Sequence, residues 1–259
     1  MILDASPQPR LHGLRCMVLG STTGIGRAAA LALAEEGADV IVHGRSSDRA
    51  AAEVAERIRA MGRRSEILMA DLADRSACDR LAEAAWNLWG GLDVWAQIAG
   101  ADVLTGSNAR MAIEAKLDML WEVDVVSAFR LCRDIGRRMK SQGRGAIIAM
   151  GWDQAETGME GDSGETFGLI KGAVHAFVRS LALSLAPQVR VNAVAPGWIK
   201  TEWGESASSS WQDRAIRETP LARWGRPEDV ARVVRFLASP ESEFLTGQIV
   251  RVNGGAVRS

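Results

Sequence analysis

Short apolar runs alternate with longer helical stretches along almost the whole of this chain. Seven of the runs have the length and composition of buried strands: LRCMVLG (14–20), ADVIVHG (38–44), SEILMA (65–70), LDVWAQIAG (92–100), GAIIAMG (145–151), VRVNAVAPG (189–197) and GQIVRVNGG (247–255). Strands separated by helices pair in parallel through right-handed crossovers. Both faces of such a sheet are covered, which explains why the runs lack polar alternation. The sequence therefore predicts one doubly wound α/β domain over 1–259, with a seven-stranded parallel sheet and helices on both faces.

The stretches between the runs carry helical periodicity and helix-end signals. Helices are expected over 24–37, 47–62, 74–90 and 163–186. The region 109–141 is long enough to predict a bent helix. A Pro-containing leader covers 1–13, and neither a linker nor an internal repeat divides the chain.

The composition argues against several classes of function. The formal net charge is −1 without a long basic run, so nucleic acid is not expected as the main partner. Cys16, Cys78 and Cys132 lie far apart without metal-ligand spacing, so we expect neither a metal site nor a structural disulfide. The N-terminus lacks an apolar segment and no apolar run reaches membrane-spanning length, which predicts a cytoplasmic protein without a membrane partner.

A glycine-rich loop joins the first expected strand to the first expected helix. Its sequence is LGSTTGIG (19–26), so the phosphate-contacting residues would be Gly20, Ser21, Thr22, Thr23, Gly24, Ile25 and Gly26. Gly20 allows a tight exit from the strand, Gly24 allows the backbone to approach a pyrophosphate, and Gly26 allows close packing of helix on strand. The helix N-terminus offers free N–H groups to the phosphates. The alternative is that these glycines serve the turn alone.

Several motifs in the same order make the chain resemble the short-chain dehydrogenase/reductase family over nearly its whole length. The T-G-x3-G-x-G loop of that family appears with Leu19 at the usual Thr, and QIAG (97–100) keeps Ala99 and Gly100 of its N-N-A-G. The resemblance implies a Rossmann fold that binds a nicotinamide cofactor. It places Asp71, followed by Leu72, at the adenine ring. It also places the P-G-x-x-x-T segment at the carboxamide of the nicotinamide, which here gives Pro196, Gly197, Ile199 and Thr201.

The end of the second strand predicts which cofactor is used. NAD-binding sites of this type have an acid there for the ribose hydroxyls, whereas this chain has Gly44 followed by Arg45 and Ser46. A guanidinium can contact a 2′-phosphate through two N–H groups. Asp48 is the only nearby acid and is expected to cap the next helix. We therefore expect NADP(H) rather than NAD(H), with Arg45 as a solvated loop cation as the alternative.

The chain contains no tyrosine, although the resemblance implies a Tyr that donates a proton to the substrate and a Lys one helical turn later. Lys171 matches the Lys and is also expected to hold the cofactor ribose. Phe167 stands at the Tyr position, four residues earlier and on the same helix face. Since Phe cannot donate a proton, the proton in any reduction must come from another group.

The other two catalytic positions implied by the resemblance have changed as well. Asp124 stands at the Asn position and Trp152 at the Ser position, although spacing from Phe167 brings Asp153 or Gln154 closest to the Ser. Asp124 either pairs with Lys171 or carries a raised pKa in a buried site. Dienoyl-CoA reductases of the family resemble this arrangement, because some have Asp at the Asn position and lack the Tyr. For Asp124 and Asp153 a purely structural role is the alternative to a catalytic one.

The segment 202–226 corresponds to the substrate lid of the family. It contains Trp203, Trp211 and Trp224, and Trp198 directly precedes it. Together with Trp152 they could form an apolar wall that stacks a sugar, an aromatic ring or a flat acyl chain. For Trp211 and Trp224, packing within the lid or at a subunit interface is the favoured alternative.

The leading hypothesis is an NADP(H)-dependent oxidoreductase that reduces a carbonyl group or a conjugated double bond of a small molecule. Its proton would come from Asp124, Asp153 or water. The alternatives are a catalytically silent cofactor-binding sensor or partner subunit, and a non-redox isomerase or lyase on the same fold. The resemblance also implies a homo-oligomer, a tetramer or a dimer, formed through the helices that hold Asp124 and Lys171.

Overall fold

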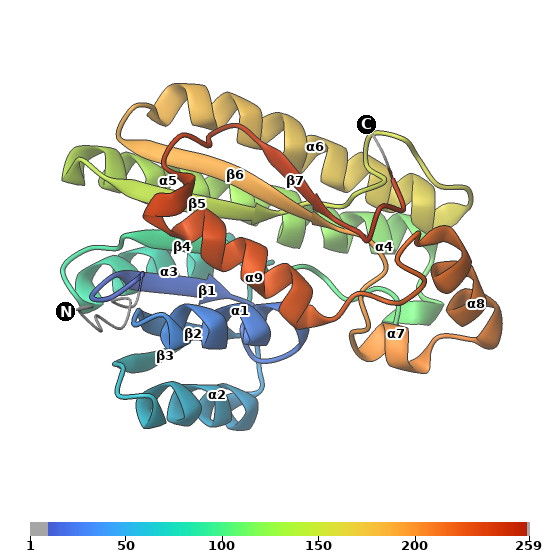
Figure 1. The fold of residues 1–259 in the computed structure, drawn as a ribbon, viewed down its shortest axis with the longest axis horizontal. Coiled ribbons are helices and arrows are strands. Elements are labelled where there is room, and N and C mark those ends of the chain that lie inside the picture. The colour runs from blue at the N-terminus through green and yellow to red at the C-terminus, as the bar shows by residue number, and fades with distance from the viewer. Residues whose placement is uncertain (1–9, 258–259) are drawn as a thin grey trace, which may run out of the picture.

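The computed structural model describes residues 10–257 and contains a seven-stranded sheet in which every neighbouring pair is parallel. The strands are β1 (Arg15–Leu19), β2 (Asp39–Gly44), β3 (Ser65–Met69), β4 (Val94–Gln97), β5 (Gly145–Met150), β6 (Val189–Pro196) and β7 (Ile249–Val252). Their order across the sheet is β3-β2-β1-β4-β5-β6-β7 (Figure 1). The predicted doubly wound fold is confirmed, while most of the expected leader lies outside the described residues.

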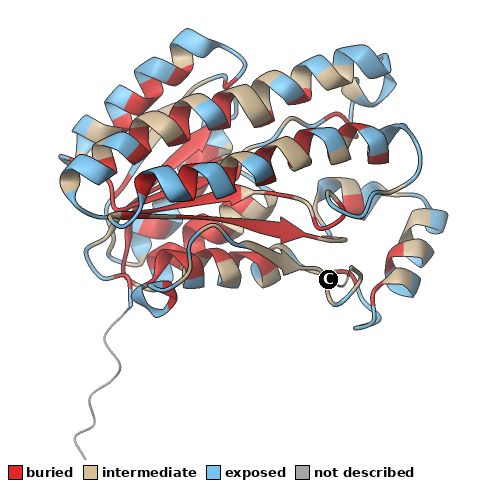
Figure 2. Ribbon diagram, turned by 90° about the horizontal axis from the view of Figure 1, so that it is seen from above, coloured by how far each residue is buried: buried red, intermediate tan, exposed pale blue. Residues whose placement is uncertain are grey.

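Helices cover both faces of this sheet. The α-helices are α1 (Gly24–Glu35), α2 (Asp48–Ala60), α3 (Arg75–Leu88), α4 (Ile113–Leu120), α5 (Ser127–Gln142), α6 (Asp162–Leu185), α7 (Glu202–Ser206), α8 (Ser209–Glu218) and α9 (Pro227–Ala238). Helix α1 packs against α2 and α9, and α5 packs against α3 and α6. Figure 2 shows the buried strands between helices whose outer faces are exposed. Since both faces are covered, every residue of β2 is buried and the apolar runs need no alternation.

The bend expected within 109–141 is a change of helix type. The short 3₁₀ turn η1 (Asn108–Arg110) is followed by α4, and a π-helical segment, η2 (Trp121–Val126), connects α4 to α5. Segments of π-helix occur often at functional sites because they change the direction of side chains. Asp124 lies in the middle of η2 and is buried. A third short turn, η3 (Pro240–Ser242), leads from α9 towards β7.

One helix meets the length and composition of a membrane span, which the sequence analysis did not expect. Helix α6 is 24 residues long and has a mean hydropathy of 1.2 over its most apolar window. Its buried side chains include Val174, Val178 and Leu181, which pack in the core beneath the sheet. The core helix of a globular domain meets the same criterion.

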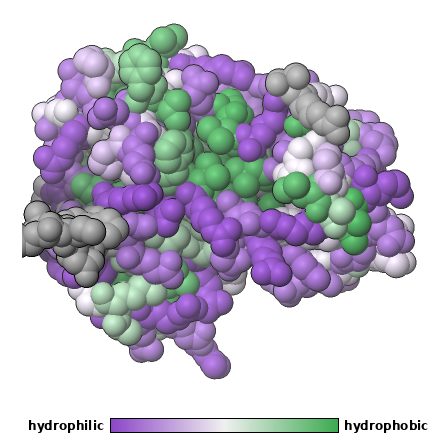
Figure 3. Space-filling model, viewed as in Figure 1, coloured by the Kyte–Doolittle hydropathy of each residue, from purple (hydrophilic) through white to green (hydrophobic). Residues whose placement is uncertain are grey.

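Strand β7 forms one edge of the sheet, and all four of its residues are only partly buried. Figure 3 shows apolar side chains gathered in the middle of the face on which Figure 1 places β6 and β7 between α6 and α9. Ile249, Val250 and Val252 pack against the two core clusters from this edge. An apolar sheet edge is a surface that natural proteins usually cover or pair.

A buried carboxylate holds three strands together at the amino end of the sheet. Asp93, just before β4, accepts hydrogen bonds from the backbone and the guanidinium of Arg15 at the start of β1. Arg144, just before β5, donates a further hydrogen bond to it at 3.0 Å. Burial acts to raise the pKa of Asp93, but the hydrogen bonds from Arg15 and Arg144 outweigh burial and hold the pKa below its usual value.

We predict that Asp93→Asn lowers the free energy of unfolding by about 1.5–3 kcal/mol at neutral pH, because it weakens hydrogen bonds to two cations. Urea unfolding measures this difference. A carboxyl group with a depressed pKa contributes stability above its ordinary pKa and loses it as the pH falls through the folded value. The difference between the proteins should therefore shrink below about pH 4. The control is Glu53→Gln, since both side chains of its ion pair with Arg49 are exposed. Such a pair should contribute less than about 1 kcal/mol to the free energy of unfolding.

Candidate functional site

The carboxyl edge of the sheet brings the predicted cofactor motifs together. A Cβ at Gly26 would collide with the carbonyl oxygen of Gly20, and a Cβ at Gly20 would lie 2.8 Å from the Cα of Ala99. Gly20 also has a φ of +71°, which favours glycine. The loop after β1 therefore packs directly on the loop after β4, and only glycine fits at these two positions.

The remaining cofactor residues lie around this contact. Gly24 begins α1 and faces Thr201, whose Cγ2 is 3.6 Å from the position of a Cβ at Gly24. Gly197, after β6, donates its backbone N–H to the carbonyl oxygen of Val252 at 3.1 Å. Asp71 is exposed after β3 and accepts the backbone N–H of Ala73. The other predicted cofactor residues lie in or beside the same loops, Ile25 in the first turn of α1 and Pro196 at the end of β6: Ser21, Thr22, Thr23, Ile25, Leu72, Gly100, Pro196 and Ile199.

A buried histidine supports the glycine loop, and the sequence analysis assigned it no role. Nδ1 of His43, in β2, accepts the backbone N–H of Gly20 at 3.1 Å, and the backbone N–H of His43 donates to Oγ of Ser21 at 2.9 Å. Burial lowers the pKa of His43 to about 4. The imidazole is therefore neutral at physiological pH and can serve as the acceptor. The sequence signal was present, since a single His stands inside the apolar run ADVIVHG (38–44).

The end of β2 places a cation at the surface. A Cβ at Gly44 would lie 2.7 Å from Cγ2 of Thr22 in the glycine loop, so Thr22 would have to shift to admit a side chain there. Arg45 and Ser46 follow, and both are exposed. The N-cap of α2 is Ser47, which accepts the backbone N–H of Ala50, and not the expected Asp48, which begins the helix.

Asp124 and Lys171 form a buried ion pair. Lys171 Nζ lies 2.7 Å from Asp124 Oδ1, and the side chains expose 8% and 2% of their surface. Asp124 Oδ2 accepts the backbone N–H of Ala101 at 2.8 Å, and Lys171 Nζ donates to the carbonyl oxygen of Met150 at 3.2 Å. The pair joins η2 and α6 to the loop after β4 and the end of β5. Pairing and hydrogen bonding are what make two buried charges tolerable.

Two aromatic rings lie where the resemblance implies hydroxyl groups. Trp152, after β5, and Phe167, on α6, have ring centroids 6.2 Å apart in a tilted arrangement. Phe167 is only partly buried, and it lines a small cavity of about 60 Å³ together with Val103, Leu104 and Thr166. This side of the site is an apolar wall.

Asp153 and Gln154 follow Trp152 and are both buried. One carboxylate oxygen of Asp153 accepts a hydrogen bond from Nδ2 of Asn253 at 3.1 Å and lies 3.0 Å from the position of a Cβ at Gly197. Within residues 10–257 the other oxygen has no hydrogen-bond partner. Burial raises the pKa of Asp153 to about 6. Asp153 is thus a carboxyl group that gains or loses its proton near pH 6, next to Gly197 of the segment expected at the nicotinamide.

A second buried histidine supports the β5 loop. Nε2 of His175, one turn after Lys171 on α6, accepts the backbone N–H of Trp152 at 3.4 Å. A Cβ at Gly151 would collide with this imidazole. Burial lowers the pKa of His175 to about 4, against the charge of Glu156 nearby. The backbone that carries Trp152 and Asp153 is therefore held by a neutral imidazole.

The expected lid forms two short helices, α7 and α8, and carries a cluster of tryptophans. Trp198, Trp203, Trp211 and Trp224 make five ring pairs with centroids 5.5 to 6.2 Å apart. Trp152 pairs with Phe167 and takes part in none of these five contacts. The guanidinium of Arg214 lies over Trp198 and Trp211.

A family profile described as enoyl-(acyl carrier protein) reductase matches residues 20–257. The 3-oxoacyl-[acyl-carrier-protein] reductase FabG of Aquifex aeolicus is 33% identical over 253 residues, covering 95% of this chain and 98% of the relative. The versicolorin reductase of Emericella nidulans is 33% identical over 269 residues, covering 99% of this chain and all of the relative.

Solved structures agree with these relatives. A 7α-hydroxysteroid dehydrogenase complexed with NADH and 7-oxo glycochenodeoxycholic acid superposes with a TM-score of 0.88 at 28% identity, covering 100% of this chain and 99% of that one. A short chain dehydrogenase from Burkholderia cenocepacia in complex with NADP gives a TM-score of 0.85 at 30% identity, covering 95% and 99%. The chain therefore belongs to the short-chain dehydrogenase/reductase family of oxidoreductases.

Proposed function

We propose that this protein is an NADP(H)-dependent oxidoreductase that reduces a carbonyl group or a conjugated double bond with a non-standard proton donor. The observation that carries the proposal is the pairing of a closely packed cofactor cradle with the buried Asp124–Lys171 ion pair. A protein that had kept the fold but lost the cofactor site would need neither the cradle nor the ion pair.

The residues present fit a nicotinamide dinucleotide. Gly20 and Gly26 allow the loop to pack tightly against its own backbone and the loop after β4, and Gly24, at the N-terminus of α1, has only Thr201 among the described residues near the position of its missing Cβ. Backbone N–H groups at a helix N-terminus suit a phosphate. We infer that the exposed guanidinium of Arg45 contacts a 2′-phosphate, because Gly44 leaves no acid to compete for the ribose. One relative binds NADH and another NADP, so the preference rests on this chain's own residues. When bound, the cofactor supplies a hydride.

Lys171 has one N–H donor that can bind a further partner. An ammonium group has three N–H donors, and two of them go to Asp124 and to the carbonyl oxygen of Met150. Among the described residues the third has no partner, so it can bind a ribose hydroxyl or a water. The negative charge of Asp124 offsets the positive charge of Lys171, which leaves the pair neutral beside the reacting groups.

The proton must come from a group other than residue 167. Both oxygens of Asp124 already accept hydrogen bonds, from Lys171 and from Ala101. Asp153 has one oxygen without a partner in the described chain and a pKa of about 6. We therefore propose Asp153, acting directly or through a water, as the proton donor in preference to Asp124. The apolar rings of Trp152 and Phe167 would lie against the substrate.

We predict that Arg45→Ala weakens NADPH binding about tenfold to a hundredfold, because charge-assisted hydrogen bonds to a phosphate are lost. NADH binding should not change. Calorimetric titration of the purified protein with each cofactor measures both affinities. Arg49→Ala is the control, since Arg49 is an exposed cation on the next helix and pairs with Glu53. Equal affinity of the wild type for NADPH and NADH would refute the role of Arg45.

A general acid donates only while it is protonated, so kcat/KM for reduction should fall as the pH rises above about 6. Asp153→Asn should remove this dependence and lower kcat by about 10²–10⁴. The rate is measured as NADPH oxidation with a ketone and an enone. Asp124→Asn serves as the comparison at the ion pair. An unchanged rate and pH profile in Asp153→Asn would assign the proton to Asp124 or to water.

The Trp152–Phe167 contact favours a second candidate, a cofactor-binding protein without catalysis. Two rings with centroids 6.2 Å apart offer no hydroxyl group to a substrate carbonyl. This candidate predicts the same NADPH affinity without NADPH oxidation at any pH. A non-redox isomerase or lyase would instead convert its substrate with no net oxidation of the cofactor.

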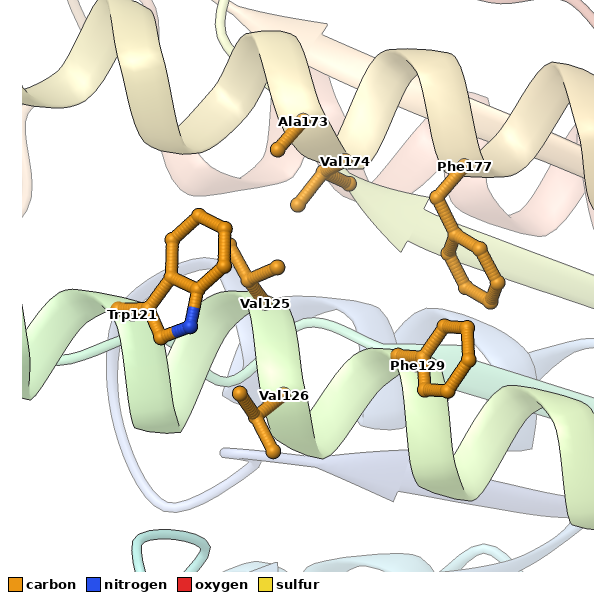
Figure 4. Close-up of a pocket in the computed structure, with 7 residues that line it drawn as sticks. All are labelled: Trp121, Val125, Val126, Phe129, Ala173, Val174 and Phe177. Carbon is orange, nitrogen blue, oxygen red and sulfur yellow. The ribbon is translucent and has the colours of Figure 1, made fainter.

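We propose that the protein forms a homo-oligomer, a dimer or a tetramer, through η2, α5 and α6. These elements line an open apolar groove of about 260 Å³. Figure 4 shows Trp121, Val125 and Phe129 on one helix, turned towards Ala173, Val174 and Phe177 on the other. Trp121 and Phe129 expose 41% and 45% of their surface. Exposed apolar patches of this kind are typical of protein interfaces.

We predict that Phe129→Asp reduces the molar mass of the particle, measured by light scattering, because it places a charge in the apolar interface. Leu183→Asp is the control, since Leu183 lies on α6, is 84% exposed and is not among the residues that line the groove. A wild-type particle with the mass of one chain, or a mutant particle of unchanged mass, would contradict this interface.

A further inference from the structure

Two tryptophans of the lid cluster lie on neighbouring segments of the chain. Trp198 follows Gly197 in the loop after β6, and its carbonyl oxygen accepts the backbone N–H of Gly225 at 2.8 Å. Trp203 lies on α7 within the lid. Their rings are nearly parallel, with an interplanar angle of 23° and centroids 6.2 Å apart. They form a stacked pair with one member in the loop after β6 and the other on α7.

The cluster also contains hydrogen-bond donors that the protein leaves unused. In the described part of the chain, neither Nε1 of Trp198 nor Nε1 of Trp224 has a hydrogen-bond partner, although both atoms are buried. Trp224 is 8% exposed. A buried donor without an acceptor costs about 1–3 kcal/mol, and indole N–H groups usually find a partner when buried. An acceptor atom supplied by a ligand would remove this cost.

Arg214 fastens the lid to the body of the domain. It forms an ion pair of 2.8 Å with Glu160, in the loop before α6, and another of 2.7 Å with Glu218 on its own helix. The same guanidinium covers the rings of Trp198 and Trp211. Arg214 therefore ties α8 to the loop before α6, while Trp203 on α7 is held by ring contacts with Trp198, Trp211 and Trp224.

We infer that Trp198 and Trp203 are a clamp for a planar aromatic or conjugated substrate that carries a carbonyl oxygen at its edge. The ring of the substrate lies between the two indoles, and its oxygen accepts from the indole N–H groups of the cluster. This inference rests on the proposed function, because it names the substrate class of the same site.

Binding requires an outward movement of α7. A ring between two indoles is in van der Waals contact with each at about 3.5 Å, so the indole planes must be about 7 Å apart. The two rings are stacked on each other in this structure, with centroids 6.2 Å apart, so they must separate to admit a substrate ring. The contacts that Trp203 makes with Trp211 and Trp224 are exchanged for contacts with the substrate.

Two ketones with the same number of carbon atoms test the clamp: 2-acetylnaphthalene, which is planar, and 1-acetyladamantane, which is not. Calorimetry with the full chain should show that the planar ketone binds tighter by on the order of tenfold, because it stacks on two ring faces. Trp203→Leu should remove the preference, and Trp203→Phe should restore part of it. Trp89→Leu, a tryptophan beneath Arg64 and outside the cluster, should keep it.

Equal binding of the two ketones, or an unchanged preference in Trp203→Leu, would overturn the clamp. The Phe variant shows whether a loss reflects the ring or the fold, because it keeps an aromatic side chain on α7. NADPH titration of the same samples separates this result from the proposed function. If the protein binds NADPH but shows no preference for the planar ketone, the clamp alone is refuted. If it does not bind NADPH, the proposed function is refuted.

Discussion

The buried ion pair between Asp124 and Lys171 is the interaction on which the site depends. It connects a π-helical segment, the long helix α6 and the ends of two central strands. Removing one partner from a buried pair typically destabilises a protein by about 3–5 kcal/mol, whereas replacing both by well-packed apolar groups is often neutral. Stability alone therefore gives no reason for two charges here. Their place at the carboxyl edge of the sheet does, because ligands of open α/β folds bind there.

The two ends of the sheet serve different purposes. At the amino end, Asp93 joins the beginnings of three strands through arginine side chains. At the carboxyl end, two neutral imidazoles, His43 and His175, hold the glycine loop and the loop after β5 through backbone N–H groups. Charged pairs thus fix the scaffold, while uncharged acceptors set the backbone of the loops proposed to bind the cofactor. A neutral acceptor adds no charge to the proposed site.

The strands and the motifs could be predicted from the sequence because they depend on local patterns. Buried parallel strands need continuous apolar runs, and a glycine at position 26 has one clear packing reason, which the structure shows. The contact of Trp152 with Phe167 could not be predicted, because it depends on how the β5 loop meets α6. The cap of α2 was wrongly assigned to Asp48, because Ser47 and Asp48 are both good caps and only the backbone angles decide between them. Spacing from Phe167 placed Asp153 at the site. Its raised pKa could not be predicted, because it results from burial, which depends on the tertiary structure.

Helix α6 presents different residues to two surroundings. Lys171 faces the ion pair and the end of β5, while Phe177, fewer than two turns along, lies on the outer apolar groove. A continuous helix transmits displacement along its axis almost without loss. A second subunit seated on the groove would therefore act as a mechanical brace for the lysine. The precision of the chemistry would then depend partly on assembly, and a separated subunit would keep its fold while its lysine lost exact alignment.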